Sequence, residues 1–348
     1  MRSLAHIAYS SKGKGIVLLL LAIVLLGTFL RAYDLGTESI WVDEASSIKL
    51  AVKDFISVIR EAGYTQNHPP LYFVILHFWI RIFGDSEVAT RSLSAIFGVA
   101  SILLIYHVGS MLFYNRRIGL LVALLTAVST YLIFYSQETR AYTLLLLLSL
   151  LSHFFFIRIL RGGGYWQYIF YFTAIVLLGY THIYGSFIIA SQALSFLLFW
   201  GKHRTQRIRF LVTLVSGVIM LLPLLHFIGG RVTRWVGETG GWGVPTLTTF
   251  KYTLTRFSGY GTGQEYIMWI FITMIFLSFF SFKLQGKYWN WKGPVKSLNR
   301  LAKKIKFDHI EEQLIVFIWL FFSILAPFIL SQFISPIYLT RYLVGASP

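Results

Sequence analysis

Long apolar segments alternate with short polar loops along most of the chain. Apolar runs of about 20 residues recur, and each is long enough to cross a bilayer as a helix. We expect membrane spans at Gly15–Tyr33, Val88–Phe113, Ile118–Tyr135, Ala141–Ile159, Tyr165–Tyr180, Ile183–Trp200, Phe210–Ile228, Tyr266–Phe282 and Leu314–Phe333. The pattern predicts an all-α fold, a polytopic membrane bundle of about nine transmembrane helices.

The first polar region, residues 34–87, contains shorter helical patterns. Apolar side chains recur there at helical spacing, at Ile48, Val52, Phe55 and Ile59. That spacing predicts an amphipathic helix that lies in the membrane interface. Pro69 and Pro70 then precede Leu71–Phe83, an apolar stretch too short to span a bilayer comfortably. We expect it to form a juxtamembrane or re-entrant helix.

Composition agrees with a membrane protein and limits its chemistry. The chain is 56% hydrophobic and 13% charged, whereas soluble domains carry about 25% charged residues. It has no cysteine, which excludes disulfide and thiolate chemistry and leaves the compartment unspecified. The first apolar segment follows three basic residues, as in a signal peptide, but it lacks a small-residue cleavage site. We interpret it as a retained helix.

The formal charge of +17 is unevenly distributed. Most of the 31 lysines and arginines lie in segments that share one side, namely the N-terminus and residues 114–117, 158–164, 201–209 and 283–313. The positive-inside rule makes that side cytoplasmic. The charge therefore indicates topology and attraction to anionic lipid. No nucleic-acid-binding motif accompanies it, so we expect no nucleic acid partner.

This topology divides a single membrane domain over residues 1–348 into loops on two sides. Residues 34–87 and the Gly- and Trp-rich residues 229–265 form outer loops, and residues 283–313 form a basic cytoplasmic loop. We expect Trp235 and Trp242 to anchor the second outer loop in the membrane interface. The alternative is that they stack on a sugar. The chain stops on the outer side where another helix could begin, so we expect truncation at the C-terminus.

Several polar groups gather on the outer side, each at a junction between a loop and an apolar segment. They are Asp43-Glu44, Asn67-His68, Gln137–Arg140, Thr181–Tyr184 and Arg341-Tyr342. Lipid headgroups lie at this level. A proton- or ion-coupled transporter would place such groups near the membrane midplane, so the pattern favours chemistry at the surface.

The pair of acids at Asp43 and Glu44 has two interpretations. Adjacent carboxylates at a membrane surface are suited to proton transfer. Alternatively, they begin the next helix and interact with its dipole. Arg140 also has two interpretations, a local ion pair with Glu138 or a bond to an anionic headgroup, because guanidinium geometry suits phosphate. The Arg341-Tyr342 pair is either an interfacial anchor or part of a site.

The order of these motifs resembles the membrane glycosyltransferases of the C superfamily. The resemblance is carried by Asp43-Glu44, His-Pro-Pro-Leu-Tyr (68–72), Ser-Glu-x-x-x-Arg (86–91), Ser-Gln-Glu-Thr-Arg-Ala-Tyr (136–142), Tyr-Thr-His-Ile-Tyr-Gly (180–185) and Pro-x-x-x-x-Arg-Tyr-Leu (336–343). The chain is most similar to the branch of protein O-mannosyltransferases and lipid A aminoarabinose transferases. The similarity covers essentially the whole chain, and the six motifs together are specific at the superfamily level.

That resemblance implies an inverting transferase that moves a sugar from a polyprenyl-phosphate carrier to a protein, lipid or glycan acceptor outside the cytoplasm. It implies that Asp43 is the general base and that Glu44 supports it. The residues it implies at the lipid phosphate or the sugar are His68, Arg140, His182, Tyr184 and Arg341, with His182 either a hydrogen-bond donor or a metal ligand. A histidine at position 68 replaces the lysine that relatives often carry, which makes the charge there pH-dependent.

Glu138 matches the position of an acid that holds a divalent metal in some relatives. The resemblance therefore leaves Mg²⁺, Mn²⁺ or Zn²⁺ as an open cofactor, although the spacing of the candidate ligands does not establish one. A lipid-linked donor needs no Gly-rich nucleotide loop, and the chain has none. The alternative function is a lipid-linked sugar flippase or transporter, which would use the same phosphate-binding groups without needing Asp43.

Overall fold

The computed structural model describes residues 2–65, 68–237, 244–257, 266, 268–269, 310–333 and 337–346. Over these residues the chain is helical and contains no strand, which confirms the predicted all-α fold. The helices are α1 (Arg2–Ala32), α2 (Val42–Ala51), α3 (Phe55–Thr65), α4 (Leu71–Phe83), α5 (Glu87–Leu112), α6 (Arg116–Val128), α7 (Thr130–Ser136), α8 (Tyr142–Leu160), α9 (Tyr165–Thr181), α10 (Gly185–Leu198), α11 (Arg207–Gly237), α12 (Leu247–Phe257), α15 (Ile310–Phe333) and the 3₁₀ helix η2 (Thr340–Ala346).

Within the described part of the chain, five helices are long and apolar enough to cross a membrane, which supports an integral membrane protein. They are α1, α5, α8, α11 and α15. The pair α6 and α7 forms a sixth candidate span, broken by a 60° bend. Helices α9 and α10 are shorter, with 17 and 14 residues. The expected span over residues 266–282 lies almost entirely outside the described residues, so the number nine stays a prediction.

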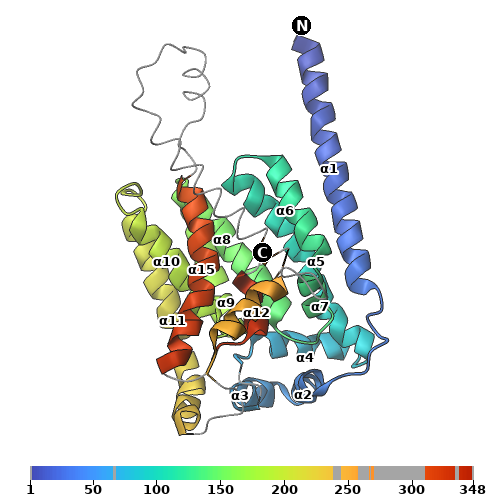
Figure 1. The fold of residues 1–348 in the computed structure, drawn as a ribbon, viewed down its shortest axis with the longest axis vertical. Coiled ribbons are helices and arrows are strands. Elements are labelled where there is room, and N and C mark those ends of the chain that lie inside the picture. The colour runs from blue at the N-terminus through green and yellow to red at the C-terminus, as the bar shows by residue number, and fades with distance from the viewer. Residues whose placement is uncertain are drawn as a thin grey trace.

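The first polar region forms three short helices at one end of the bundle. Figure 1 shows α2, α3 and α4 together at the end opposite the N-terminus of α1. Helix α4 has the predicted bounds, Leu71–Phe83. The single amphipathic helix that we expected over residues 48–60 is instead split into α2 and α3. The reason is Asp54, whose side chain accepts the N–H of Ser57 at 3.0 Å and so begins a new helix.

Two predicted loops are partly helical. Helix α11 continues through Pro223 to Gly237, past the predicted end of the span at Ile228, and α12 lies within the predicted outer loop over residues 229–265. Trp235 is therefore on a helix, whereas Trp242 lies outside the described residues. Helix α15 begins at Ile310, so the predicted basic loop over residues 283–313 loses its last residues to a helix, and its remainder lies outside the described residues.

Helix α8 is the central element of the bundle. Its span is 72% buried, compared with 17% for the span of α1, whose outward face is apolar. Apolar clusters pack on two sides of α8, and Leu145 and Leu146 belong to different clusters. A turn of five residues, 137–141, joins α7 to the start of α8. Burial of α8 therefore fixes the position of this polar turn within the protein.

Candidate active site

Segments that are distant in the sequence meet around the turn that precedes α8. They are the start of α2, the turn 137–141, the junction between α9 and α10, and the 3₁₀ helix η2. Together they carry the candidate residues Asp43, Glu138, Arg140, His182, Tyr184 and Arg341, and His68 stacks against the same group. The structure thus brings together most of the polar groups that the sequence placed on one side of the membrane.

An ion pair between Asp43 and Arg341 joins the start of α2 to η2. The guanidinium Nη1 of Arg341 donates to Oδ2 of Asp43 at 2.7 Å. The two side chains are 32% and 23% exposed, so solvent and ligands can reach the pair. No hydrogen bond reaches the second carboxylate oxygen, Oδ1, from the described residues. That oxygen is consequently available to accept a proton.

A second guanidinium lies beside this pair. Arg140 is buried, and its Nη1 donates to the hydroxyl of Ser47 at 3.1 Å and to the backbone carbonyl of Asp43 at 3.3 Å. Arg140 therefore binds the first turn of α2 through its backbone and a neutral side chain. Two cations thus flank Asp43, an arrangement suited to a multiply charged anion such as a phosphate.

Glu44 has a different environment from its neighbour Asp43. It is 1% exposed, and its carboxylate accepts from Arg91 Nε at 2.9 Å and from Arg91 Nη2 at 2.7 Å. It also accepts from the backbone N–H of Thr139 at 2.9 Å. Burial alone raises the pKa of Glu44, but the bonds to Arg91 and Thr139 outweigh it, and the net pKa is lowered. Glu44 positions the turn before α8 and is not exposed to a substrate.

Arg91 extends this ion pair into the first polar region. Its Nη1 donates to the carbonyls of Leu35 and Glu38 at 3.0 Å and 2.8 Å, and its Nη2 donates to the carbonyl of Ser39 at 3.3 Å. One side chain on α5 therefore holds both the chain after α1 and the start of α2. This arrangement fixes the backbone that carries Asp43.

Glu138 is a buried acid near the two guanidinium groups. Its Oε2 is buried and has no hydrogen bond among the described residues. Burial, followed by the charge of Glu44, raises the pKa of Glu138 to about 8, while Arg140 and Arg341 act in the opposite direction. Glu138 is consequently protonated at neutral pH and adds no negative charge beside Asp43.

Aromatic rings line the side of the cluster near η2. The rings of His68 and His182 have centroids 4.6 Å apart, and the ring of Tyr342 lies 5.4 Å and 4.7 Å from them. Burial, with smaller effects from the two arginines, lowers the pKa of His182 to about 3, so this imidazole is neutral. Its Nδ1 accepts the N–H of Tyr184 at 3.1 Å, which leaves the proton on Nε2. That N–H has no acceptor among the described residues.

Tyr184 positions the segment before η2. It is 3% exposed, and its hydroxyl donates to the carbonyl of Ile337 at 2.8 Å. The same hydroxyl accepts the N–H of Leu339 at 3.4 Å. Its hydrogen-bonding capacity is directed to the backbone, so Tyr184 places Arg341 and does not present its hydroxyl to a ligand.

The described residues do not fit a divalent metal at Glu138. No three histidine, aspartate or glutamate side chains lie close enough together over the described part of the chain. The nearest charges also include the guanidinium groups of Arg140 and Arg341, which repel a cation. We therefore derive no step through a metal.

Sequence reasoning missed two residues that the structure places next to the site, and it left open whether Tyr342 belongs to the site. Tyr342 contacts both histidines, Arg91 holds Glu44, and Ser47 binds Arg140. Arg91 could have been identified, because it belongs to a motif that carries the family resemblance. Ser47 lies one helical turn after Asp43, but nothing in the sequence pairs it with a residue 93 positions away.

Comparisons with known proteins agree with the motifs. Residues 67–227 match the family model of dolichyl-phosphate-mannose-protein mannosyltransferases. The match includes His68, Glu138 and Arg140, but Asp43 and Arg341 lie outside it. A search of curated protein sequences found no match.

The fold is similar to that of an archaeal oligosaccharyltransferase. The crystal structure of the Archaeoglobus fulgidus enzyme in its apo form superposes with a TM-score of 0.53 at 11% sequence identity. The match covers 95% of this chain and 49% of the other, so the chain spans about half the length of that protein. The family model and the fold together confirm the resemblance to the membrane glycosyltransferases of the C superfamily.

Proposed function

We propose that the chain transfers a sugar from a polyprenyl-phosphate carrier to an acceptor at the Asp43 cluster, on the extracytoplasmic face of the membrane. The acceptor is a hydroxyl or phosphate of a protein, lipid or glycan. The observation that carries this proposal is the 2.7 Å contact between Asp43 and Arg341, with Arg140 beside it. This contact combines a base with cations that suit a phosphate.

In the proposed reaction Asp43 acts as the general base. Its Oδ1 takes the proton of the acceptor while the acceptor oxygen forms a bond to the anomeric carbon of the sugar. The bond from that carbon to the carrier phosphate breaks on the opposite face, and the electron pair leaves with the phosphate. One displacement of this kind inverts the configuration at the anomeric carbon.

Arg341 and Arg140 would stabilise the charge that develops on the departing phosphate. A guanidinium has five N–H donors, so Arg341 is able to retain its bond to Asp43 while it binds a phosphate oxygen. The Nε2–H of His182 supplies a neutral donor on the same side, next to His68 and Tyr342. A protonated Glu138 leaves these cations without a second carboxylate that would compete for them.

The proposal is tested by reconstituting the protein in vesicles and supplying a panel of polyprenyl-phosphate sugars with candidate acceptors. Transfer of one of these sugars, with inverted configuration in the product, is the expected result. Movement of the carrier across the bilayer without transfer from any donor would contradict the proposal and identify the protein as a flippase. Retention of configuration would contradict the single displacement.

A further inference from the structure

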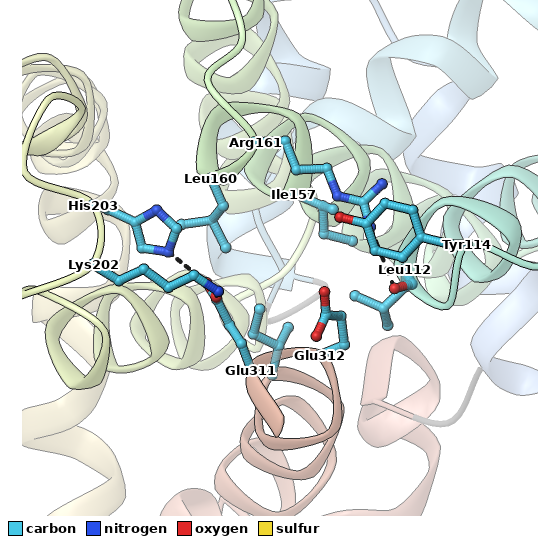
Figure 2. A pocket seen from close by; sticks show the side chains of 10 residues that line it. Leu112, Tyr114, Ile157, Leu160, Arg161, Lys202, His203, Glu311 and Glu312 are labelled. Atoms are coloured by element: carbon cyan, nitrogen blue, oxygen red, sulfur yellow. Dashed lines mark hydrogen bonds and ion pairs between the residues drawn. The ribbon is translucent and has the colours of Figure 1, made fainter. Parts of the chain in front are cut away.

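A polar cavity lies at the opposite end of the bundle from Asp43. It has a volume of about 340 Å³ and lies between the turn after α5, the end of α8, the turn after α10 and the start of α15 (Figure 2). Arg140 precedes α8 and Arg161 follows it. The 19 residues of α8 extend about 28 Å. The cavity is therefore separate from the candidate active site.

The polar groups that line this cavity differ in their exposure. Tyr114, Arg161 and Lys202 are exposed and border the mouth. Deeper in the cavity, His203 is 5% exposed and both Glu311 and Glu312 are 8% exposed. Two leucines and two isoleucines complete the lining. The cavity thus has a cationic rim and an acidic interior with apolar walls.

Contacts between helices fix these groups in place. Glu311 accepts from the Nζ of Lys202 and contacts Nε2 of His203 at 2.5 Å, which ties α15 to the turn after α10. The guanidinium of Arg161 lies 3.8 Å from the centre of the Tyr114 ring and donates to the carbonyl of Leu112 at 3.3 Å. Figure 2 shows the carboxylate of Glu312 between these two groups of contacts. The site is therefore preformed.

The distribution of charge selects the chemistry of a ligand. An inorganic anion would meet two carboxylates inside the cavity, and a simple cation would have to pass Arg161 and Lys202 at the mouth. A ligand that carries one positive and one negative group would match both the acidic interior and the cationic rim. A volume of about 340 Å³ is near the lower limit for ligand pockets, so the group is small. A primary ammonium donates hydrogen bonds to carboxylates, whereas a quaternary ammonium has no N–H to donate.

We propose that this cavity binds a phosphoethanolamine group, with its ammonium directed to the carboxylates of Glu311 and Glu312 and its phosphate at Arg161 and Lys202. The group is either the headgroup of phosphatidylethanolamine or free phosphoethanolamine. This inference goes beyond the proposed transfer reaction, because the cavity shares no residue with the Asp43 cluster.

Binding is tested on the purified full chain by native mass spectrometry in detergent. The probes are short-chain phosphatidylethanolamine, phosphatidylcholine and phosphatidylglycerol at equal concentrations. Loss of one charge-assisted hydrogen bond should weaken binding of the choline lipid about tenfold or more. Equal or tighter binding of phosphatidylcholine or phosphatidylglycerol would overturn the proposal. Adding soluble O-phosphoethanolamine shows whether the bound group comes from a lipid or from the free compound. If it displaces the lipid, the site belongs to the free compound. If the lipid stays bound, the site belongs to the lipid headgroup.

Three variants show whether the lipid binds at this cavity. Glu312→Gln should remove the preference for ethanolamine, because Glu312 is proposed to bind the ammonium. Arg161→Gln should weaken the binding of all three lipids, because they share the phosphate that Arg161 is proposed to bind. Arg158→Gln is the matched control, because Arg158 is an exposed arginine in the last turn of α8 that does not line the cavity, and its lipid binding should be unchanged. A preference that survives in Glu312→Gln, or lipid binding that is undiminished in Arg161→Gln, would overturn the assignment. Elution profiles and thermal unfolding show whether each variant is folded. The lipid panel on the wild type tests the proposal even where a variant does not fold.

Discussion

Two adjacent acids at the start of α2 differ in role because their surroundings differ. Asp43 is partly exposed and has one carboxylate oxygen outside any hydrogen bond among the described residues, whereas Glu44 is buried and bonded through both oxygens. The structural interpretation of the acid pair therefore fits Glu44, and Asp43 stays the candidate base. Asp43 has the access that a base requires, and Glu44 stabilises the backbone at the start of the helix.

The ion pair between Glu44 and Arg91 predicts a strong effect on stability. Replacing Arg91 with leucine leaves Glu44 buried without its cation, which costs about 3–5 kcal/mol for a buried pair. The double variant Arg91→Leu/Glu44→Gln should recover part of that loss, since glutamine still accepts from Thr139 without carrying a charge. Thermal unfolding in detergent gives the comparison. A double variant that unfolds no later than Arg91→Leu alone would show that an uncompensated charge is not the cause.

The raised pKa of Glu138 predicts a dependence of stability on pH. Between about 4.5 and about 8 the unfolded side chain is ionised while the folded one retains its proton. The folded state is therefore favoured at the lower pH, and this contribution is lost as pH rises through that window. Glu138→Gln carries no charge at any pH, so its unfolding temperature should exceed that of the wild type at pH 8, with a smaller difference at pH 5.

His182 has the opposite effect, since its lowered pKa makes the folded state less favourable as pH falls from about 6.5 to about 3. It is present in both proteins, so the difference between them isolates Glu138. A difference that stays constant between pH 5 and pH 8 would show that Glu138 does not titrate in this range.

At the scale of helices, sequence signals near an element's ends decided which predictions succeeded. Helix α4 has the expected bounds because Pro70 precedes it and Gly84 follows it, with a left-handed φ of 84°. The break between α2 and α3 was missed because the cap at Asp54 lies inside a regular apolar pattern. Helix α11 runs to Gly237, past the predicted end at Ile228, because an apolar run marks the part of a helix that suits a membrane and not the end of the helix itself.

Sequence reasoning predicted which polar segments share a side of the membrane but not which atoms bond to one another. Counting basic residues placed the polar groups on one side, and the structure brings most of them together. The partners of each group depend on packing between helices, which one sequence does not contain. Asp43 and Arg341 are 298 positions apart, and neither residue carries a local signal for the other.

Close packing of α5 on α6 predicts sensitivity to a single methyl group. A Cβ at Gly119 would contact the hydroxyl of Ser110 and lie 2.6 Å from the backbone carbonyl of Tyr106, which cannot move without displacing α5. Gly119→Ala should therefore lower the unfolding temperature. Gly15→Ala is the matched control, because no atom lies within 4 Å of its added carbon. Equal unfolding temperatures of the two variants would contradict this account of the packing.

At the scale of the whole molecule, the two polar sites lie at opposite ends of the bundle. The distribution of basic residues predicts that the Asp43 end is outside the cytoplasm and that the cavity with Arg161 is cytoplasmic. The arrangement separates a proposed transfer reaction on one face from a proposed lipid-binding cavity on the other. Both proposals depend on the bundle, but only the first depends on Asp43.

The absence of cysteine allows a direct test of this orientation. A single cysteine at the exposed Glu38 should react with a membrane-impermeant maleimide in intact cells. A single cysteine at the exposed Arg204, in the turn after α10, should react only after the membrane is opened. The reverse pattern would place the candidate active site in the cytoplasm and contradict the topology.

The central claim is that Asp43 is the base of a sugar transfer. Its most direct test is the rate of transfer from a polyprenyl-phosphate sugar in vesicles, with wild type, Asp43→Asn and Asp85→Asn compared at equal amounts of folded protein. Asp85 is an exposed acid of the same outer region and serves as the control. Loss of a general base predicts a decrease of about 10²- to 10⁴-fold in Asp43→Asn and none in the control. A rate for Asp43→Asn within a few-fold of wild type would contradict the account.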